Sequence, residues 1–153
     1  KLGKLLIPSF AIGRCQEIIY ALNNLKKSKR LPDVPIFIDS PLAVSATDIF
    51  RLHTECFKDD ILDLIRTQKD PFGFDNLFYI RTKEDSKTLN TYNRPCIIIA
   101  ASGMMEAGRI KHHLANNIEN KKNTILVVGY CSPQTLGRKI ADREPVVSIY
   151  GNK

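Results

Sequence analysis

The stretch Cys96-Ile-Ile-Ile-Ala-Ala-Ser-Gly-Met-Met-Glu-Ala-Gly-Arg-Ile-Lys-His-His-Leu114 joins an apolar run to an amphipathic one through a Ser-Gly turn. The run from Cys96 to Ala101 does not alternate between apolar and polar residues, which is typical of a strand covered on both faces in a parallel sheet. After the turn at Ser102 and Gly103, a helix is expected over 106–118. Strand, turn and helix in this order are the repeating unit of an α/β fold.

The same alternation extends along the whole chain. We expect helices over 10–27, 44–57, 59–66, 84–89, 106–118 and 135–141. The expected strands are Lys4–Pro8, Pro35–Asp39, Leu77–Arg81, Pro95–Ala101, Thr124–Tyr130 and Val146–Tyr150. Residues 69–74 read as a loop, and no linker divides the chain. The pattern predicts one domain over 1–153, an α/β, doubly wound, mostly parallel sheet of about six strands with helices on both faces.

Composition narrows the possible partners. The chain has 153 residues, is 43% hydrophobic and carries a net charge of +7 with a pI of about 9.3. No apolar run approaches the roughly 18 residues of a membrane span, so we expect no membrane partner. A basic balance favours a polyanion such as nucleic acid, but it also fits a solubilising surface with cations near helix ends. Charge alone leaves both readings open.

The motifs of common catalytic and nucleotide sites are missing. The chain contains no Gly-x-Gly-x-x-Gly after its first strand, no Gly-Lys-Ser/Thr, and no HxHxDH, HExxH or Gly-x-Ser-x-Gly. Four cysteines occur without a CxxC pair, and their spacing favours reduced, mostly buried thiols of a cytosolic protein over a zinc site. We therefore expect no catalytic residue and no metal site within this chain, and we expect a cytoplasmic protein.

Four polar turns follow the expected strands, at residues 9–14, 39–41, 102–109 and 129–134. In parallel α/β sheets ligands bind beyond the carboxyl ends of the strands, so these turns predict a single binding edge. The turn at 102–109 offers backbone N–H groups, a helix N-terminus and nearby cations to an anion. A Gly turn between strand and helix is also common without any ligand.

Individual charged residues allow two readings each. Arg109 and His113 share one helix face, whereas the adjacent His112 and His113 point to different faces and cannot easily ligate one metal. We interpret one histidine as a surface residue and the other as packed against a neighbour. Asp39 either places a carboxylate on the binding edge or caps the following turn, the second being slightly favoured. Arg14 either faces the edge or is a solvated helix cation.

Five motifs in order resemble one family, the β-CASP domain of metallo-β-lactamase-fold RNA nucleases. The resemblance covers almost the whole chain, and it is greatest to the endonuclease subunit of the cleavage-and-polyadenylation machinery and its bacterial and archaeal homologues. The motifs are Leu6–Glu17, Pro35–Ala43, Asp70–Phe72, Ala100–Arg109 and Val128–Gly137.

The resemblance implies a two-domain, zinc-dependent hydrolase. A metallo-β-lactamase domain holds two zinc ions through a His-x-His-x-Asp-His motif, and a metal-bound hydroxide attacks an RNA phosphodiester. The β-CASP domain is inserted into that domain and closes over the RNA. Because this chain lacks the zinc motif and starts without Met, we expect an excised β-CASP insert, without cofactor and inactive by itself, whose two zinc ions belong to the missing domain.

The resemblance also implies partners and contact residues. The partners are RNA and the missing metallo-β-lactamase domain, with a homodimer left open. The family places Ser102, Gly103 and Met104 at a helix N-terminus facing the metal site. One rival is a non-catalytic RNA-binding or scaffold member, and another is a Rossmann-like nucleotide-binding module. The candidate RNA phosphate contacts are Arg14, Ser102, Gly103, Met104 and Arg109, with His112 and Lys111 as weaker ones.

Overall fold

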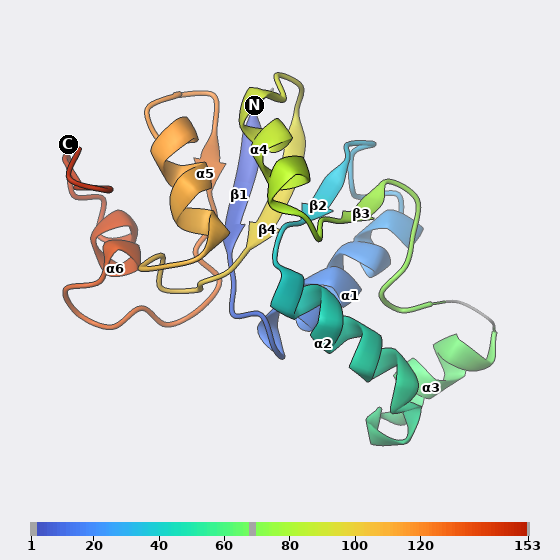
Figure 1. The fold of residues 1–153 in the computed structure, drawn as a ribbon. Coiled ribbons are helices and arrows are strands. Elements are labelled where there is room, and N and C mark those ends of the chain that lie inside the picture. Colours follow the sequence, from blue (N-terminus) through green and yellow to red (C-terminus); the bar gives the residue numbers. More distant parts are fainter. Residues whose placement is uncertain (1–2, 68–69, 153) are drawn as a thin grey trace.

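A five-stranded parallel sheet forms the centre of the computed structural model, which describes residues 3–67 and 70–152 (Figure 1). Within these residues the strand order is β3-β2-β4-β1-β5, and every neighbouring pair is parallel. The strands are β1 (Lys4–Pro8), β2 (Ile36–Ile38), β3 (Leu77–Tyr79), β4 (Cys96–Ala100) and β5 (Thr124–Ile125). The predicted α/β class and parallel sheet are confirmed.

The helices cover both faces of the sheet. Helices α1 and α2 pack on one face, while α4, α5 and α6 lie on the other (Figure 1). Helix α3 and a short 3-10 turn at Thr54–Cys56 lie beyond the end of α2, away from the strands. The helix bounds are α1 (Arg14–Lys27), α2 (Pro41–Leu52), α3 (Asp59–Arg66), α4 (Lys83–Thr91), α5 (Arg109–Asn117) and α6 (Leu136–Ala141). Among the described residues, none of the helices has the length and apolar character to span a membrane.

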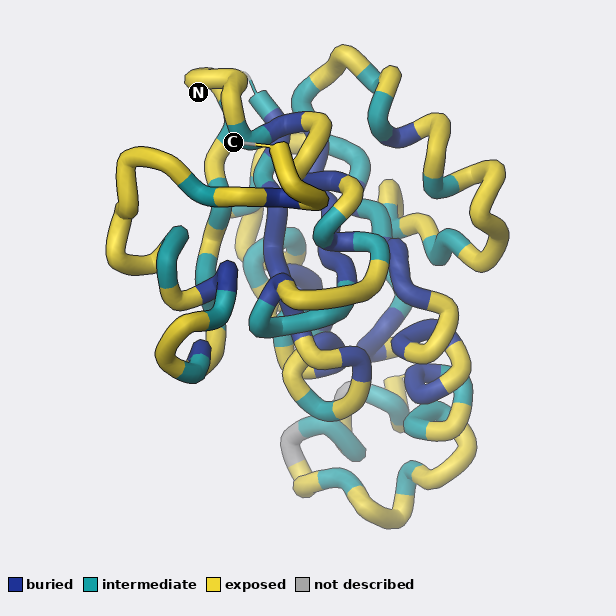
Figure 2. The backbone as a smooth tube through the Cα atoms, turned by 60° about the vertical axis from the view of Figure 1, so that its left-hand side comes forward, coloured by how far each residue is buried: buried dark blue, intermediate teal, exposed yellow. Residues whose placement is uncertain are grey.

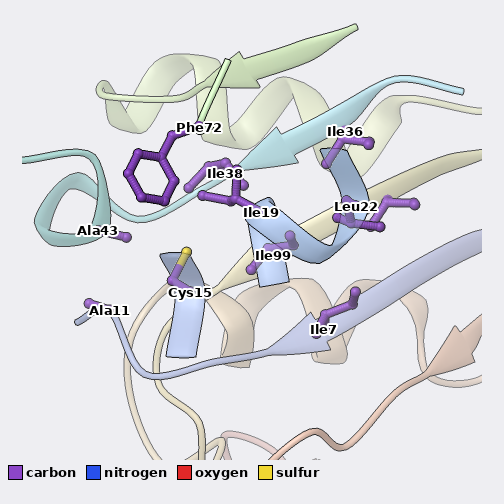
Figure 3. Close-up of a cluster of buried hydrophobic side chains, with 11 residues drawn as sticks. Ile7, Ala11, Cys15, Ile19, Leu22, Ile36, Ile38, Ala43, Phe72 and Ile99 are labelled. Carbon is purple, nitrogen blue, oxygen red and sulfur yellow. The ribbon is translucent and has the colours of Figure 1, made fainter. Parts of the chain in front are cut away.

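Strand β4 divides the core into two clusters because its residues point alternately to the two faces. All five of its residues are buried. Ile97 and Ile99 contribute to the cluster under α1 and α2, which Figure 3 shows in close-up. Ile98 and Ala100 contribute to the cluster under α4, α5 and α6. Figure 2 shows that buried backbone gathers in the central strands and that exposed backbone lies in the outer loops. The non-alternating run was therefore correctly interpreted as a strand covered on both faces.

The sheet has five strands and not about six. Residues 146–150 make no ladder, and only an isolated antiparallel bridge joins Ile149 to Asn152. The chain reverses there, because Tyr150 and Gly151 both have positive φ angles, of 54° and 82°. A segment rich in strand-forming residues cannot extend the sheet when the chain folds back on itself there.

Strand β5 is much shorter than the predicted Thr124–Tyr130. Its ladder with β1 continues only as far as Leu126, whose N–H donates to the carbonyl of Leu6 (2.9 Å). The next position of β1 on that side is Pro8, which has no N–H to donate. Pro8 therefore ends the pairing, and residues 127–134 become a loop at the carboxyl edge.

Several helix boundaries also differ from the predicted ones, since α2 ends at Leu52 and not at residue 57, and α4 spans Lys83–Thr91 and not 84–89. Helix α2 begins at Pro41 and not at Val44, because Ser40 caps it: the Ser40 side chain accepts a hydrogen bond from the Ala43 N–H (3.3 Å). Proline suits the first helical position, where its missing N–H costs nothing. Helix α1 begins at Arg14 and not at Phe10. Residue 69 of the predicted loop lies outside the described residues, and 70–74 form neither helix nor strand.

Candidate nucleic-acid interface at the carboxyl edge of the sheet

The segment between β4 and α5 is a closed loop and not a short turn. The Ser102 N–H donates to the Ala107 carbonyl (3.1 Å), so the loop is joined across its base. Met105 is fully buried under the loop, and its N–H donates to the Ser102 carbonyl (3.1 Å). Helix α5 begins only at Arg109. The predicted start near Glu106, with Ser102 to Met104 at the helix N-terminus, is wrong.

Gly108 determines where α5 starts. Its φ is 77°, and a Cβ on it would lie 2.3 Å from the Ala101 carbonyl oxygen. That same carbonyl accepts a hydrogen bond from the Ile110 N–H (3.0 Å). One N–H of the first helical turn is thus satisfied by the end of β4, and the predicted anion binding at this turn stays a prediction.

Gly103 and Met104 lie at the tip of the loop and are half-buried. Their N–H groups donate to no backbone carbonyl in the described part of the chain. Gly103 packs against Phe10, since a Cβ on the glycine would lie 2.9 Å from the phenyl ring. The Met104 carbonyl accepts a hydrogen bond from the Gly137 N–H (3.0 Å). The loop is thereby held between the turn after β1 and the first turn of α6, as the predicted common edge requires.

A buried polar network lies at the remaining turn of the predicted edge, at residues 39–41, where β2 ends. Asp39 is 0% exposed, and its carboxylate receives three hydrogen bonds of 2.6 Å each. The donors are the Ser86 hydroxyl of α4, the Arg109 guanidinium and His113 Nε2 of α5. Arg109 also donates to the carbonyls of Ile80 (3.3 Å) and Arg81 (2.9 Å), just after β3. The network ties β2, β3, α4 and α5 together.

The electrostatics of Asp39 follow from this network. Burial by itself would raise the pKa of the carboxyl group, but the hydrogen bonds from His113, Ser86 and Arg109 outweigh burial and hold the pKa below its usual value. Asp39 is therefore ionised and internal. The favoured interpretation as a capping residue is wrong, because Ser40 caps α2.

One of the two adjacent histidines is packed against neighbours and the other is on the surface, as interpreted from their spacing. His113 is buried, with Nδ1 3.2 Å from the Asn90 side-chain oxygen and Nε2 on Asp39. His112 is exposed and stacks on Tyr150, the ring centroids lying 5.1 Å apart. In residues 3–67 and 70–152, no group of three or more His, Cys, Asp and Glu side chains could hold a metal ion. The donors present here do not fit the two zinc ions that the family resemblance implies.

The candidate contact residues are not all together. Ser102, Gly103 and Met104 share the loop tip beside Phe10, whereas Arg109 and His112 face the space between α4 and α5. Arg14 is exposed at the start of α1, where it pairs with Glu17 (2.6 Å). The guanidinium of Arg109 is engaged by Asp39 and is 16% exposed. Arg109 therefore has a structural role, and its phosphate contact stays a prediction.

Inspection of the sequence missed Lys83 and Lys87, which line a pocket with Arg109 and His112. It also missed that Asp39 faces Arg109 and His113. The signals were present: Lys83 and Lys87 are four residues apart at the start of a helix, as are Arg109 and His113. Residues so spaced share one helix face.

The fold and its edge define a class: a parallel α/β domain whose strands end in polar loops and in which the described residues form no cluster of three or more metal-ligating side chains. A family model described as the Beta-Casp domain matches residues 15–140. This chain belongs to the β-CASP family.

Curated relatives match almost the full chain. Ribonuclease TTHA0252 of Thermus thermophilus is 36% identical over 99% of this chain and 35% of its own length. An RNase J-like protein of Methanocaldococcus jannaschii is 33% identical over 99% of this chain and 34% of its own length. Endoribonuclease YSH1 of Saccharomyces cerevisiae is 32% identical over 90% of this chain and 18% of its own length. The chain spans about a third or less of these relatives.

Proposed function

We propose that this chain is the RNA-clamping part of a cytoplasmic, metal-dependent ribonuclease. In this proposal RNA phosphates contact the carboxyl edge of the sheet, and two zinc ions are held by a metallo-β-lactamase domain outside the chain. That domain supplies the activated water for phosphodiester hydrolysis. The observation that carries the proposal is the β-CASP match over 15–140, together with relatives named as ribonucleases.

The loop tip supports phosphate contact. The N–H groups of Gly103 and Met104 donate to no backbone carbonyl among the described residues, and successive free N–H groups are suited to phosphate oxygens. Such contacts position an RNA strand without reading its bases. The net charge of +7 adds a general attraction for the polyanion.

Exposed apolar side chains at the same edge support a covering domain. Phe10 and Ile12, which follow β1, are 44% and 61% exposed, and Leu42 at the start of α2 is 59% exposed. Large apolar side chains gathered at a polar edge are typical of a surface that meets another protein surface. The metal-bearing domain is the occupant we propose.

RNA binding by the 153-residue chain tests the proposal. We expect a fluorescently labelled single-stranded RNA to bind weakly, with the logarithm of the association constant falling by about 0.7 per phosphate contact for each tenfold rise in salt. Fluorescence anisotropy over a salt series measures this slope. The same RNA should remain uncleaved. Tight, salt-insensitive binding of a free nucleotide instead of RNA would favour a nucleotide-binding module and contradict the proposal.

A further inference from the structure

A pocket of about 370 Å³ lies between α4 and α5, beside the loop tip but separate from it. Its volume is in the lower part of the roughly 300–1,000 Å³ range of ligand pockets, which leaves room for about one nucleotide. Both helices begin at the carboxyl edge of the sheet, and their first residues, Lys83 and Arg109, line the pocket, so the pocket reaches the same edge as the proposed RNA surface. Its lining residues are Lys83, Ser86, Lys87, Asn90, Gly108, Arg109, His112 and Tyr150.

The lining is cationic and contains no carboxylate. Lys83 and Lys87 project from successive turns of α4, and neither forms an ion pair with a side chain that the structure describes. The charge of Arg109 is balanced by Asp39, which lies buried beneath it. Two uncompensated ammonium groups therefore remain on one wall, as an anion site requires.

The opposite wall carries the side chains of His112 and Tyr150. Tyr150 stacks with His112, and the Lys111 ammonium lies 5.0 Å from the centre of the Tyr150 ring. These contacts hold the Tyr150 ring against α5, next to His112 in the pocket wall. Ser86 and Asn90 are already hydrogen-bonded to Asp39 and His113, so the floor is neutral and fixed. The free donors thus lie around the opening and the carboxylate lies behind it.

We infer that this pocket binds a backbone phosphate of the RNA strand, held by Lys83 and Lys87 on one side and by His112 on the other. The inference rests on the proposed function, and it adds a second phosphate contact to that at Gly103 and Met104. Lysine ammonium groups bind phosphate as point charges, so the contact is independent of sequence.

A pair of double variants tests the inference. We expect Lys83→Ala/Lys87→Ala to weaken RNA binding about tenfold in low salt and to reduce the salt slope by about 1.4, the contribution of two contacts to a single strand. The matched control, Lys121→Ala/Lys122→Ala, removes the same charge from an exposed loop before β5, at the other edge of the sheet. It should change affinity less than twofold. Circular dichroism would confirm that each variant is folded.

The outcomes separate the inference from the proposed function. If both double variants weaken RNA binding equally, the assignment of an RNA phosphate to this pocket is overturned, while general RNA binding by the chain remains intact. Failure of the unmodified chain to bind RNA would overturn the proposed function and the inference with it.

Titration with uridine 5′-monophosphate and with inorganic phosphate, followed by amide NMR signals of α4 and α5, distinguishes a strand from a free anion. We expect both to shift those signals and to compete with RNA. Shifts without competition would indicate a site for a free anion and overturn the assignment to RNA.

Discussion

At the scale of single residues, Asp39 has the largest consequences. A buried carboxylate is costly unless its oxygens are hydrogen-bonded. Here Ser86, Arg109 and His113 supply the donors, each from a helix that packs on the same face of the sheet. The network therefore stabilises the ionised form of Asp39 and positions α4 against α5, which are the walls of the proposed phosphate pocket.

Replacing Asp39 with Asn should destabilise the chain by about 3–5 kcal/mol at neutral pH, because Arg109 loses its buried partner. The folded pKa of Asp39 lies below the usual value near 3.9, so its stabilising contribution is complete above that pH and is lost as pH falls toward the folded pKa. In urea unfolding, the difference in free energy of unfolding between wild type and variant should therefore become smaller as the pH falls from 7 to 3. Asp142→Asn, which removes an exposed partner of Arg138, is the control and should unfold like wild type.

At the scale of elements, caps and prolines decide where helices and strands end. Ser40 and Pro41 start α2 directly after Asp39, so the buried carboxylate is held between a strand end and a helix start. Pro8 ends β1 on the side of β5 and leaves residues 127–134 free to form a loop, in which Cys131 Sγ lies 3.7 Å from the Gly103 carbonyl oxygen. These short-range features create the space in which the carboxyl-edge loops gather.

The capping role of Ser40 predicts a loss of about 1 kcal/mol on change to Ala, because the Ala43 N–H loses its acceptor. Ser40→Gly should cost only a few tenths of a kcal/mol, since glycine lets water reach that N–H. Thermal unfolding of both variants measures the difference. Ser45→Ala, on an exposed position of the same helix, serves as control. A Ser40→Ala variant as stable as Ser45→Ala would exclude the capping contribution.

At the scale of the whole molecule, segments far apart in sequence make one edge. The loop tip at Gly103 and Met104 contacts Phe10 on one side and the segment containing Cys131 and Gly137 on the other. Nothing local holds these segments together. Their arrangement follows from the parallel sheet, which brings every strand end to the same side.

Close packing at Gly137 gives a test of this arrangement. A Cβ there would lie 2.7 Å from Cys131 Sγ and 2.8 Å from the Met104 carbonyl oxygen, to which the Gly137 N–H is itself bonded. Overpacking of this kind costs about 1–3 kcal/mol, so Gly137→Ala should lower the melting temperature despite the better helix propensity of alanine. Gly129→Ala meets no atom within 4 Å and should leave the melting temperature nearly unchanged. Equal melting temperatures for the two variants would contradict the packing of α6 against the loop.

Much of the fold could be read from local pattern. The apolar run at 96–101, the helical spacing after Arg14 and the turns between them were sufficient for an α/β domain with a parallel sheet. The errors fell where a local pattern met a long-range constraint: 146–150 has strand-forming residues but turns back at Tyr150 and Gly151, and 127–130 loses its partner at Pro8. Helix α5 starts late because Ser102 bonds to Ala107 and Ile110 bonds to Ala101 across the loop.

The sequence by itself determined the α/β class, most of the elements and the family resemblance, because periodicity, turns and motif order are properties of neighbouring residues. Only the tertiary structure decided which charged side chains pair with one another. Arg109 and Asp39, 70 residues apart, neutralise each other inside the fold, while Lys83 and Lys87 form no ion pair with a side chain that the structure describes and line a pocket that no motif marks. The physical reason is that charge pairing depends on distance in space, and the parallel sheet places residues side by side regardless of their separation in the chain.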